Sequence, residues 1–340
     1  MTALALPLQA NAELVSMRRL EQLLGRSRDD LLRIAGHAGR YYRPFDRRRR
    51  RGEGKWRHID NPTSELKELQ SRIQRGILAH VLFPDTMLGG VRCRSIRDNG
   101  AHHVRQPMLV TLDLRDCFPR TGNLQIFRAF RTVVGCSPKI AGLLTQLTTF
   151  QHRLPQGAPT SLTLANLTLL QMHEDIRTVA ERMDLAWTFW VDDIAFSGQR
   201  ALDAIEPIMG IIHHHGHAVR RSKIECMPCT TRMRVTGVAV NLKPSIELVR
   251  RSEIREEIFR LASLQDPLDW ELRRVRGQIN HVRYISSEQG AALNRLAERF
   301  LPAVGAGGAR PRTDETRSCS STARHSHRRV GSALLEVPTP

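Results

Sequence analysis

The chain has 340 residues, of which 41% are apolar. This length and composition can supply two or three packed units and exclude a chain that is disordered throughout. Its 52 Lys and Arg residues against 34 Asp and Glu residues give a formal net charge of +18, which favours a polyanionic partner such as nucleic acid over small acidic substrates. No apolar run approaches the roughly 20 residues of a membrane-spanning helix, and residues 1–12 lack the features of a signal peptide. We therefore expect a soluble intracellular protein without a membrane partner.

The N-terminal part is predicted to begin with two short helices within residues 14–38, because apolar residues recur there at helical spacing and Ser27 is a suitable N-cap. A helix over residues 64–82 has a similar apolar face. Between them lies a strongly basic stretch that contains Arg47, Arg48, Arg49, Arg50, Arg51, Lys55 and Arg57. One interpretation is a hairpin that cradles phosphates, with Lys55 and Arg57 on one face by the two-residue period of a strand. The other is a disordered basic tip.

The next segment, residues 89–103, is basic and glycine-rich and is predicted to be a loop. A buried strand over residues 108–113 follows and ends at Asp113. A carboxylate at the end of a strand is well placed to face a cleft. Asp116 is a second acidic candidate, and the local pattern does not choose between Asp113 and Asp116.

Residues 124–150 are mostly helical by pattern, with a break near the middle. The turn-rich residues 154–161 come next, and a long helix is predicted over residues 162–183. Gly157 and its neighbouring prolines fix the backbone and keep side chains away, which suits the close approach of a ligand or a template.

Two adjacent acids, Asp192 and Asp193, lie between apolar, β-prone residues, which predicts a strand, a tight turn and a strand with both carboxylates at the tip. A metal could bind there, although an isolated Asp pair is more often an ordinary turn. A helix over residues 201–214 and strands over residues 217–220 and 234–241 complete an α+β sheet with helices on one face.

The C-terminal part is predicted to form a separate basic bundle of three helices over residues 252–300, broken at Pro267 and Gly290. Beyond it the apolar periodicity stops, and residues 303–340 read as a disordered basic tail.

The cysteines are scattered and do not resemble a disulfide framework. Cys226 and Cys229 form a Cys-x-x-Cys pair, for which the nearest further zinc ligands would be His213, His214, His215 and His217. Ordinary thiols beside a helical histidine run are the better interpretation.

Several motifs follow one another in a specific order: the strand ending at Asp113 with Phe118 after it, Leu154-Pro155-Gln156-Gly157, Trp190-Val191-Asp192-Asp193, Lys223, and Val235-Thr236-Gly237. In this order and spacing the chain resembles reverse transcriptases, and within them the bacterial retron type, over about residues 41–241.

The resemblance implies an α+β right-hand polymerase architecture with fingers, a palm built of an antiparallel sheet plus helices, and a helical thumb. The expected divisions are N-terminal helices and fingers over residues 1–107, a palm over 108–244 with a helical portion at 123–155, a thumb over 245–302 and a tail over 303–340. Trp190 stands where the family usually has Tyr, and Leu162 where Pro usually follows the Thr-Ser pair. Either could change primer positioning or nucleotide handling, and neither removes a metal ligand.

The catalytic roles follow from the chemistry of phosphodiester formation, which uses two Mg²⁺ ions about 3.5 to 4 Å apart. Hard ions need oxygen ligands, so carboxylates from two strands must converge. Asp113 and Asp192 are the expected bridging ligands, Asp193 supports them, and the backbone carbonyl of Leu114 completes one shell. Mn²⁺ is a possible substitute. Lys223 is expected to protonate the pyrophosphate leaving group.

The resemblance also implies a nucleotide site. Lys55 and Arg57 would clamp the triphosphate, while Gln156 and Gly157 would line the pocket. Phe118 would lie under the incoming sugar, where its ring collides with a 2′-hydroxyl and so selects deoxynucleotides. Simple burial of Phe118 in the core is the alternative. Phe118 and Val191 both argue against an RNA-dependent RNA polymerase.

Contacts with the template–primer backbone are expected to be largely independent of sequence. The candidates are Arg47, Arg48, Arg49, Arg50, Arg51, Arg94, Trp190, Arg273, Arg274 and Arg276.

The expected partners are a structured noncoding RNA, its DNA product, dNTPs and a toxin or effector protein encoded nearby. Retron-type enzymes act in the bacterial cytoplasm and make a branched, RNA-linked single-stranded DNA, usually in defence against phage. One alternative is another bacterial reverse transcriptase, derived from a group II intron or associated with defence, without a branched product. Another is a catalytically silent RNA-binding protein on a polymerase scaffold, against which the intact acids argue.

Overall fold

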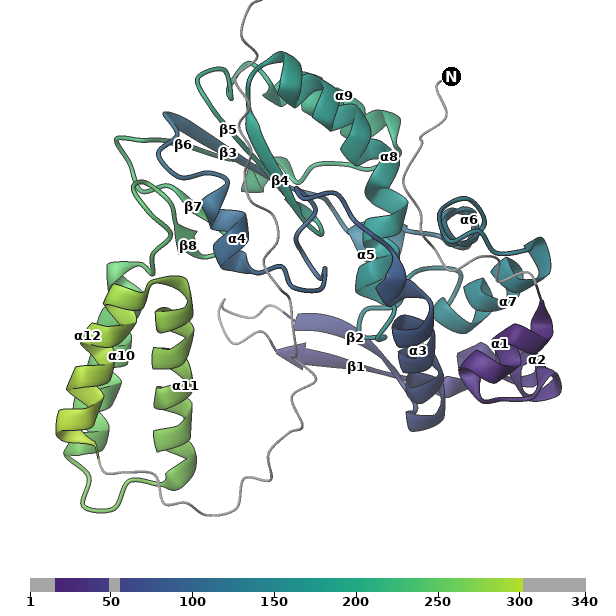
Figure 1. The fold of residues 1–340 in the computed structure, drawn as a ribbon, viewed down its shortest axis with the longest axis horizontal. Coiled ribbons are helices and arrows are strands. Elements are labelled where there is room, and N and C mark those ends of the chain that lie inside the picture. Colours follow the sequence, from purple (N-terminus) through teal and green to yellow (C-terminus); the bar gives the residue numbers. More distant parts are fainter. Residues whose placement is uncertain (1–15, 49–55, 302–340) are drawn as a thin grey trace, which may run out of the picture. The chain divides into compact units, whose positions relative to one another are not determined.

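The N-terminal helices form as the sequence predicts. We describe a computed structural model in which residues 16–48 and 56–301 are placed. Helices α1 (Met17–Leu24) and α2 (Arg28–Gly36) are N-capped by Ser16 and Ser27, whose hydroxyls accept hydrogen bonds from backbone amides in the first turn. Both helices contact α3 (Ser64–Gly76) or α7 (Pro138–Thr148), and these four helices gather at one end of the fold (Figure 1).

A hairpin of two long strands follows the first helices. A 3₁₀ turn, η1 (Ala38–Tyr41), leads into β1 (Tyr42–Arg48), which pairs antiparallel with β2 (Trp56–Pro62). The predicted hairpin is thus confirmed in the described residues, whereas Arg49, Arg50, Arg51 and Lys55 lie outside them.

Two predictions for the segments around α3 were wrong. The helix predicted to reach residue 82 ends at Gly76 and gives way to a short 3₁₀ turn, η2 (Leu78–His80). The segment predicted to be a loop contains helix α4 (Ile96–Ala101), because the Ser95 hydroxyl and the Asp98 carboxylate cap each other's backbone amides. This capping box outweighs the glycine-rich composition.

The centre of the fold is a four-stranded antiparallel sheet in the order β4-β5-β3-β6 (Figure 1). Its strands are β3 (Met108–Asp113), β4 (Ala186–Trp190), β5 (Asp193–Ser197) and β6 (Glu225–Pro228). The predicted strand ending at Asp113 and the predicted hairpin at Asp192 are both present.

The two faces of the sheet belong to two hydrophobic cores. Val110, Phe189 and Phe196 point into the core that contains helices α8 (Ser161–Arg182) and α9 (Ile205–His214). Leu109 and Ala195 point the other way, into the core shared with the C-terminal helices. The two-residue alternation along each strand therefore places the odd-numbered residues of β3 and β5 on one face. Helices α5 (Cys117–Arg120), α6 (Asn123–Arg128) and α7, with the π-helical turn η3 (Ala129–Val133), fill residues 117–148.

Two strand predictions after α9 need correction. Residues 217–220 form only an isolated antiparallel bridge, Leu114 with Val219, before a 3₁₀ turn η4 (Arg221–Lys223). The strand predicted over residues 234–241 is a small hairpin of β7 (Arg234–Val235) and β8 (Val238–Ala239). Thr236 and Gly237 both adopt positive φ angles and reverse the chain there. Helix α9 begins at Ile205, four residues later than predicted.

The C-terminal bundle consists of α10 (Leu248–Ala262), α11 (Asp269–Ile285) and α12 (Ser287–Phe300), which contact one another (Figure 1). The break at Pro267 is confirmed, but the second break lies at Ser286, which caps α12 through the Gln289 amide. Gly290 lies inside α12, where a Cβ would come within 2.2 Å of the Arg283 Cα atom. It permits close helix packing instead of ending a helix. Within the described ranges, no helix is both long and apolar enough to cross a membrane.

Candidate active site

Three carboxylates lie together at one end of the central sheet. Asp113 is the last residue of β3 and pairs directly with Asp193, the first residue of β5. Asp192 lies in the two-residue turn that joins β4 to β5, since Trp190 pairs with Asp193. The Leu114 amide donates a 2.8 Å hydrogen bond to the Asp192 carbonyl oxygen, which fixes the turn against the end of β3.

The turn itself is held in a strained conformation. Val191 has a φ of +59°, which is an outlier for a β-branched residue and costs about 1–3 kcal/mol. Gly89 packs directly against this turn, and a Cβ atom there would lie 2.6 Å from the Val191 nitrogen. The amides of Leu88 and Gly89 both donate to the Phe189 carbonyl. The position of Asp192 therefore depends on a segment about one hundred residues earlier in the chain.

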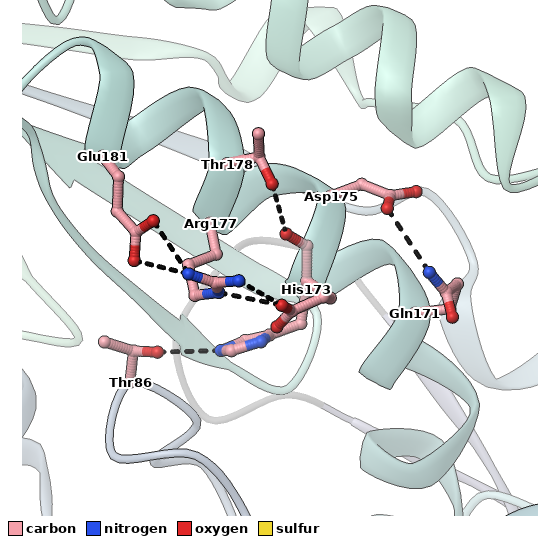
Figure 2. A network of polar contacts seen from close by, with 8 residues as sticks. Thr86, Gln171, His173, Asp175, Arg177, Thr178 and Glu181 are labelled. Atoms are coloured by element: carbon pink, nitrogen blue, oxygen red, sulfur yellow. Dashed lines mark hydrogen bonds and ion pairs between the residues drawn. The ribbon is translucent and has the colours of Figure 1, made fainter. Parts of the chain in front are cut away.

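Behind the turn, His173 of α8 ties three elements together. Its Nε2 atom lies 2.8 Å from the Thr86 hydroxyl (Figure 2). Its ring centroid lies 4.4 Å from that of Trp187 and 5.3 Å from that of Phe189. The Thr86 carbonyl in turn accepts the Phe189 amide. Burial lowers the pKa of His173 to about 4, so the ring is neutral and exchanges one hydrogen bond with the hydroxyl.

A second buried histidine braces the opposite face of the hairpin. His103 places Nδ1 2.8 Å from the Ser197 hydroxyl on β5 and Nε2 2.8 Å from the Thr188 hydroxyl on β4. Burial lowers the pKa of His103 to about 3. Strands β4 and β5, which flank the turn with Asp192, are thus joined by a neutral ring as well as by their backbone ladder.

Among the described residues, positive side chains form ion pairs with Asp113 but with neither of the other two acids. Lys223 Nζ lies 2.5 Å from Asp113 Oδ2, and Arg220 Nε lies 3.5 Å from Oδ1. Loss of hydration, followed by the negative charge of Asp113, raises the pKa of Asp192. Loss of hydration and then the Asp192 and Asp113 carboxylates raise the pKa of Asp193 to about 6, although part of this residue faces solvent.

The donor set suits a hard divalent cation. Three carboxylates are the oxygen ligands that Mg²⁺ and Mn²⁺ prefer, and no described backbone amide donates to the Leu114 carbonyl. As arranged here, no group of three His, Cys, Asp or Glu side chains in the described residues could hold an ion directly. The acids fit the ions chemically, but Lys223 and Arg220 occupy both oxygens of Asp113.

Gln156 and Gly157, two of the nucleotide-site candidates, contact the β1–β2 hairpin. Gln156 and Gly157 are joined to β2, because the Asp60 amide donates to the Gln156 carbonyl and the buried Asp60 carboxylate accepts the Gln156 amide. Arg153 also contacts the Asp60 carboxylate, at 3.3 Å. Gly157 has a φ of +128° and lies against Ile59, so a side chain does not fit there.

Phe118 and Arg57 complete the nucleotide-site candidates that the structure describes. Phe118 is half-buried in α5 and packs on the core beside Cys117, a thiol whose pKa is raised by burial and then by nearby Asp192. Arg57 lies near enough to Asp192 to lower its pKa. Arg57 also pairs directly with Arg47 across the hairpin, and two like charges in this position are unfavourable unless an anion lies between them.

The nucleic-acid candidates fall into several environments. Arg47 and Arg48 are exposed on β1, and Trp190 is half-buried at the end of β4. Arg94 forms an ion pair with Asp85, so it also has a structural role. In the C-terminal bundle Arg273 pairs with Asp269 and Arg274 with Glu257, whereas Arg276 is half-buried.

A cleft of about 1030 Å³ extends from Asp113 and Asp193 to helices α10 and α11. Arg274, Gln278 and His281 of α11 line it, and the β7–β8 turn forms another wall. The Thr236 hydroxyl in that turn accepts a hydrogen bond from the buried Asn99 amide. Sequence reasoning did not single out Arg220, Asp60 or Gly89 as site residues. Of these three residues, Arg220 could have been found from the sequence, because it stands three residues before Lys223.

An antiparallel sheet with acids at one end, a basic hairpin bound to the Gln156–Gly157 loop and a C-terminal helical bundle define a right-hand polymerase. A family described as reverse transcriptase (RNA-dependent DNA polymerase) matches residues 48–240, which is more than half of the chain. The chain belongs to this reverse transcriptase family.

Curated relatives confirm the resemblance to the retron type. The chain is 27% identical over 251 residues to the retron Ec86 reverse transcriptase of Escherichia coli, covering 73% of this chain and 77% of that protein. It is 28% identical over 284 residues to the retron Mx65 reverse transcriptase of Myxococcus xanthus, covering 77% and 65%.

Solved structures that partly resemble this one include telomerase from Candida albicans in complex with a TWJ fragment of telomeric RNA. The TM-score is 0.46 at 10% identity, over 75% of this chain and 56% of that one. A foamy viral protease-reverse transcriptase in complex with double-stranded DNA has a TM-score of 0.46 at 17% identity, over 76% and 43%.

Proposed function

We propose that this protein is a retron-type RNA-directed DNA polymerase that copies a structured noncoding RNA into single-stranded DNA linked to that RNA by a branch. The observation that supports the chemistry best is the placement of Asp113, Asp192 and Asp193 at one end of the sheet with Lys223 beside them. Membership of the reverse transcriptase family supports the polymerase activity. The retron names of the relatives support the retron type.

Enzymes of this family generally use divalent metal ions, and we propose two Mg²⁺ ions here, with Mn²⁺ as a substitute. Asp113 and Asp192 would hold both ions, with Asp193 and the Leu114 carbonyl in support. When bound, the ions lower the pKa of the primer hydroxyl and neutralise charge on the triphosphate.

The chain's own residues then orient the nucleotide and handle the leaving group. Arg57, with Lys55, binds the triphosphate, and the Gln156–Gly157 loop lines the base and sugar pocket. The Phe118 ring excludes a 2′-hydroxyl. Lys223, an ammonium group beside Asp113, donates a proton to the departing pyrophosphate.

The proposed division of labour follows the fingers, palm and thumb of the family. Residues 1–107 hold the nucleotide and template from one side, residues 108–244 carry the acids, and residues 245–302 hold the duplex. The cleft of about 1030 Å³ lined by Arg274, Gln278 and His281 adjoins the acids and is the proposed place for the nucleic acid. Lys and Arg side chains there bind phosphates whatever the sequence, so recognition of one RNA must depend on its shape.

The test is to express the chain in a bacterial cytoplasm together with its flanking DNA, and to compare the wild type with Asp192→Asn. Asp184→Asn is the matched control, because Asp184 is an exposed turn residue with a φ of +53°, a conformation that Asn also adopts readily. We expect template–primer extension with Mg²⁺ and dNTPs in the wild type and the control, and a loss of roughly 10³-fold or more in Asp192→Asn.

DNA recovered from the cells separates the competing functions. Single-stranded DNA that shortens on ribonuclease treatment, from the wild type and the control only, supports the retron type. Extension activity without branched DNA indicates another bacterial reverse transcriptase. An RNA-binding wild type without extension activity would identify a catalytically silent protein. Full activity in Asp192→Asn would refute the site.

A further inference from the structure

Arg220 is held directly opposite Asp113 by backbone hydrogen bonds. The Arg220 amide donates to the Asp113 carbonyl at 2.9 Å, and the Arg115 amide donates to the Ala218 carbonyl at 2.7 Å. Together with the bridge between Leu114 and Val219, these bonds extend the β3 ladder beyond the end of the strand. Opposed residues of an antiparallel pair share one face, so the Arg220 side chain starts on the same side of the ladder as Asp113.

The Arg220 guanidinium contacts two acids that are three residues apart. Its Nε atom lies 3.5 Å from Asp113 Oδ1, and its Nη2 atom lies 3.2 Å from Asp116 Oδ1. Only the contact with Asp116 is a hydrogen bond. The Arg220 guanidinium is therefore shared between the two carboxylates, and it is bound more closely to Asp116.

Apart from its contacts with arginines, the Asp116 side chain forms no hydrogen bond or ion pair with the described residues that would stabilise the fold. It stands at the N-cap position of α5 but accepts no capping hydrogen bond there, and its φ of +51° is the left-handed conformation. Its carboxylate faces only arginines among the described residues: Arg220, and Arg115, whose Nε atom lies 3.6 Å away. An open pocket of about 620 Å³ adjoins it and gives the Arg220 side chain room to move.

Asp113 cannot bind a divalent ion while both of its oxygens contact cationic side chains. Lys223 carries its ammonium on a flexible four-carbon stem, whereas the Arg220 guanidinium is a rigid plane, so it leaves Asp113 readily only if a second anion lies nearby. Asp116 supplies that anion, since its Oδ1 atom already lies 3.2 Å from Arg220 Nη2.

We propose that Arg220 is a positioning residue that shields Asp113 when no divalent ion is bound and transfers to Asp116 when one binds. This inference rests on the proposed function, because it concerns ion binding at the same acids. Arg220 then competes with the ion for Asp113, and Asp116 weakens that competition by accepting the guanidinium.

The experiment measures Mn²⁺ binding by the full chain freed of nucleic acid, using the electron paramagnetic resonance signal of free Mn²⁺. Arg220→Gln removes the competitor and should lower the dissociation constant about three- to tenfold, within the coupling range of residues in one ion-pair network. Asp116→Asn leaves Arg220 on Asp113 and should raise the constant by a similar factor. Arg221→Gln is the matched control, since it removes the same charge from the adjacent residue and no ion pair joins Arg221 to a described acid.

The double variant, with both Arg220→Gln and Asp116→Asn, tests whether Arg220 moves between the two acids or whether net charge alone sets Mn²⁺ affinity. If Asp116 acts only by holding Arg220, the double variant should bind Mn²⁺ within about twofold of Arg220→Gln alone. If the effects are those of net charge, the two substitutions cancel in the double variant, and Arg221→Gln tightens binding as Arg220→Gln does. Either of those results would overturn the proposal, as would unchanged or weaker binding in Arg220→Gln.

The proposed function has a separate control. Asp113→Asn should abolish the same Mn²⁺ binding. A wild type that binds no more Mn²⁺ than Asp113→Asn would refute the metal site itself, and the exchange with it. If the wild type binds Mn²⁺ but the effects of the two substitutions simply add in the double variant, the metal site stands and only the exchange of Arg220 between the acids is refuted. Circular dichroism and thermal unfolding of each variant establish that the fold is retained, which is expected for side chains at the surface.

Discussion

Lys223 forms an ion pair with Asp113, with 2.5 Å between Nζ and Oδ2, although 110 positions separate the two residues in the chain. The pair forms because η4 follows directly on the segment that extends the β3 ladder. A proton donor is thereby fixed beside the acid that we propose as a metal ligand.

Lys223→Gln should lower the single-turnover rate of nucleotide addition by about 10²-fold, the lower end of general-acid effects. Nucleotide affinity should change much less, because the lysine acts on the leaving group. Rapid-quench measurements over a range of dNTP concentrations separate rate from affinity. Lys139→Gln, an exposed lysine on α7, is the control. An unchanged rate in Lys223→Gln would remove the lysine from the mechanism.

Phe118→Val should increase the incorporation of ribonucleotides relative to deoxynucleotides by at least about tenfold, which corresponds to 1.4 kcal/mol of lost discrimination. The measurement is the ratio of kcat/KM for UTP and dTTP on one template–primer. Phe127→Val removes a ring that packs on the same hydrophobic core but follows α5, so it controls for loss of packing. Equal sugar selectivity in Phe118→Val and the wild type would leave burial as the role of Phe118.

Acid should destabilise the protein through His103 and His173. Burial lowers their pKa values to about 3 and about 4, whereas an unfolded histidine titrates near 6.5. Between these values the unfolded chain binds more protons, so stability is lost as pH falls below about 6.5. Each histidine should cost about 2 kcal/mol by pH 5.

Urea unfolding at pH 7.5, 6 and 5 measures this dependence. His103→Gln keeps one donor and one acceptor for the Thr188 and Ser197 hydroxyls but cannot be protonated. Its unfolding free energy should fall less steeply with acid than that of the wild type. Parallel curves would show that His103 does not carry the acid sensitivity.

Gly89→Ala should destabilise the acid-bearing turn, because its Cβ would collide with the backbone of Trp190 and Val191. We expect a loss of about 1–3 kcal/mol of unfolding free energy, the usual range for overpacking, together with reduced polymerase activity. Gly142→Ala is the matched control, since a Cβ there meets nothing within 4 Å in the middle of α7, and it should stabilise by roughly 0.5–1 kcal/mol. Equal stability of the two variants would contradict the packing argument.

The acid-bearing strands could be predicted because their signals are local. Asp113 ends an apolar run, and Asp192 and Asp193 interrupt another. The local pattern did not choose between Asp113 and Asp116, and only the resemblance to reverse transcriptases favoured Asp113. In the structure Asp113 ends β3 in register with Asp193, whereas Asp116 lies beyond the strand. That register is set by contacts between distant segments, which no local pattern contains.

The elements that the sequence did not predict also depend on contacts that a local pattern does not show. Helix α4 depends on one capping box within a glycine-rich segment, and the bridge at Val219 depends on where β3 ends. Gly89 looked like a loop glycine because its neighbour, Val191, is far away in sequence. The roles of Lys55 and Arg49, Arg50 and Arg51 remain predictions, since these residues lie outside the described part of the chain.

The segment that fixes Asp192 also closes an edge of the sheet. Strand β4 is the outermost strand on its side, and a free edge of this kind can recruit a strand from another molecule. The bridge between Met87 and Phe189, with the hydrogen bonds from Leu88 and Gly89, covers the edge at the end where the acids lie. Loosening this segment would therefore expose β4 to edge-to-edge aggregation, and loss of solubility would accompany the loss of catalysis.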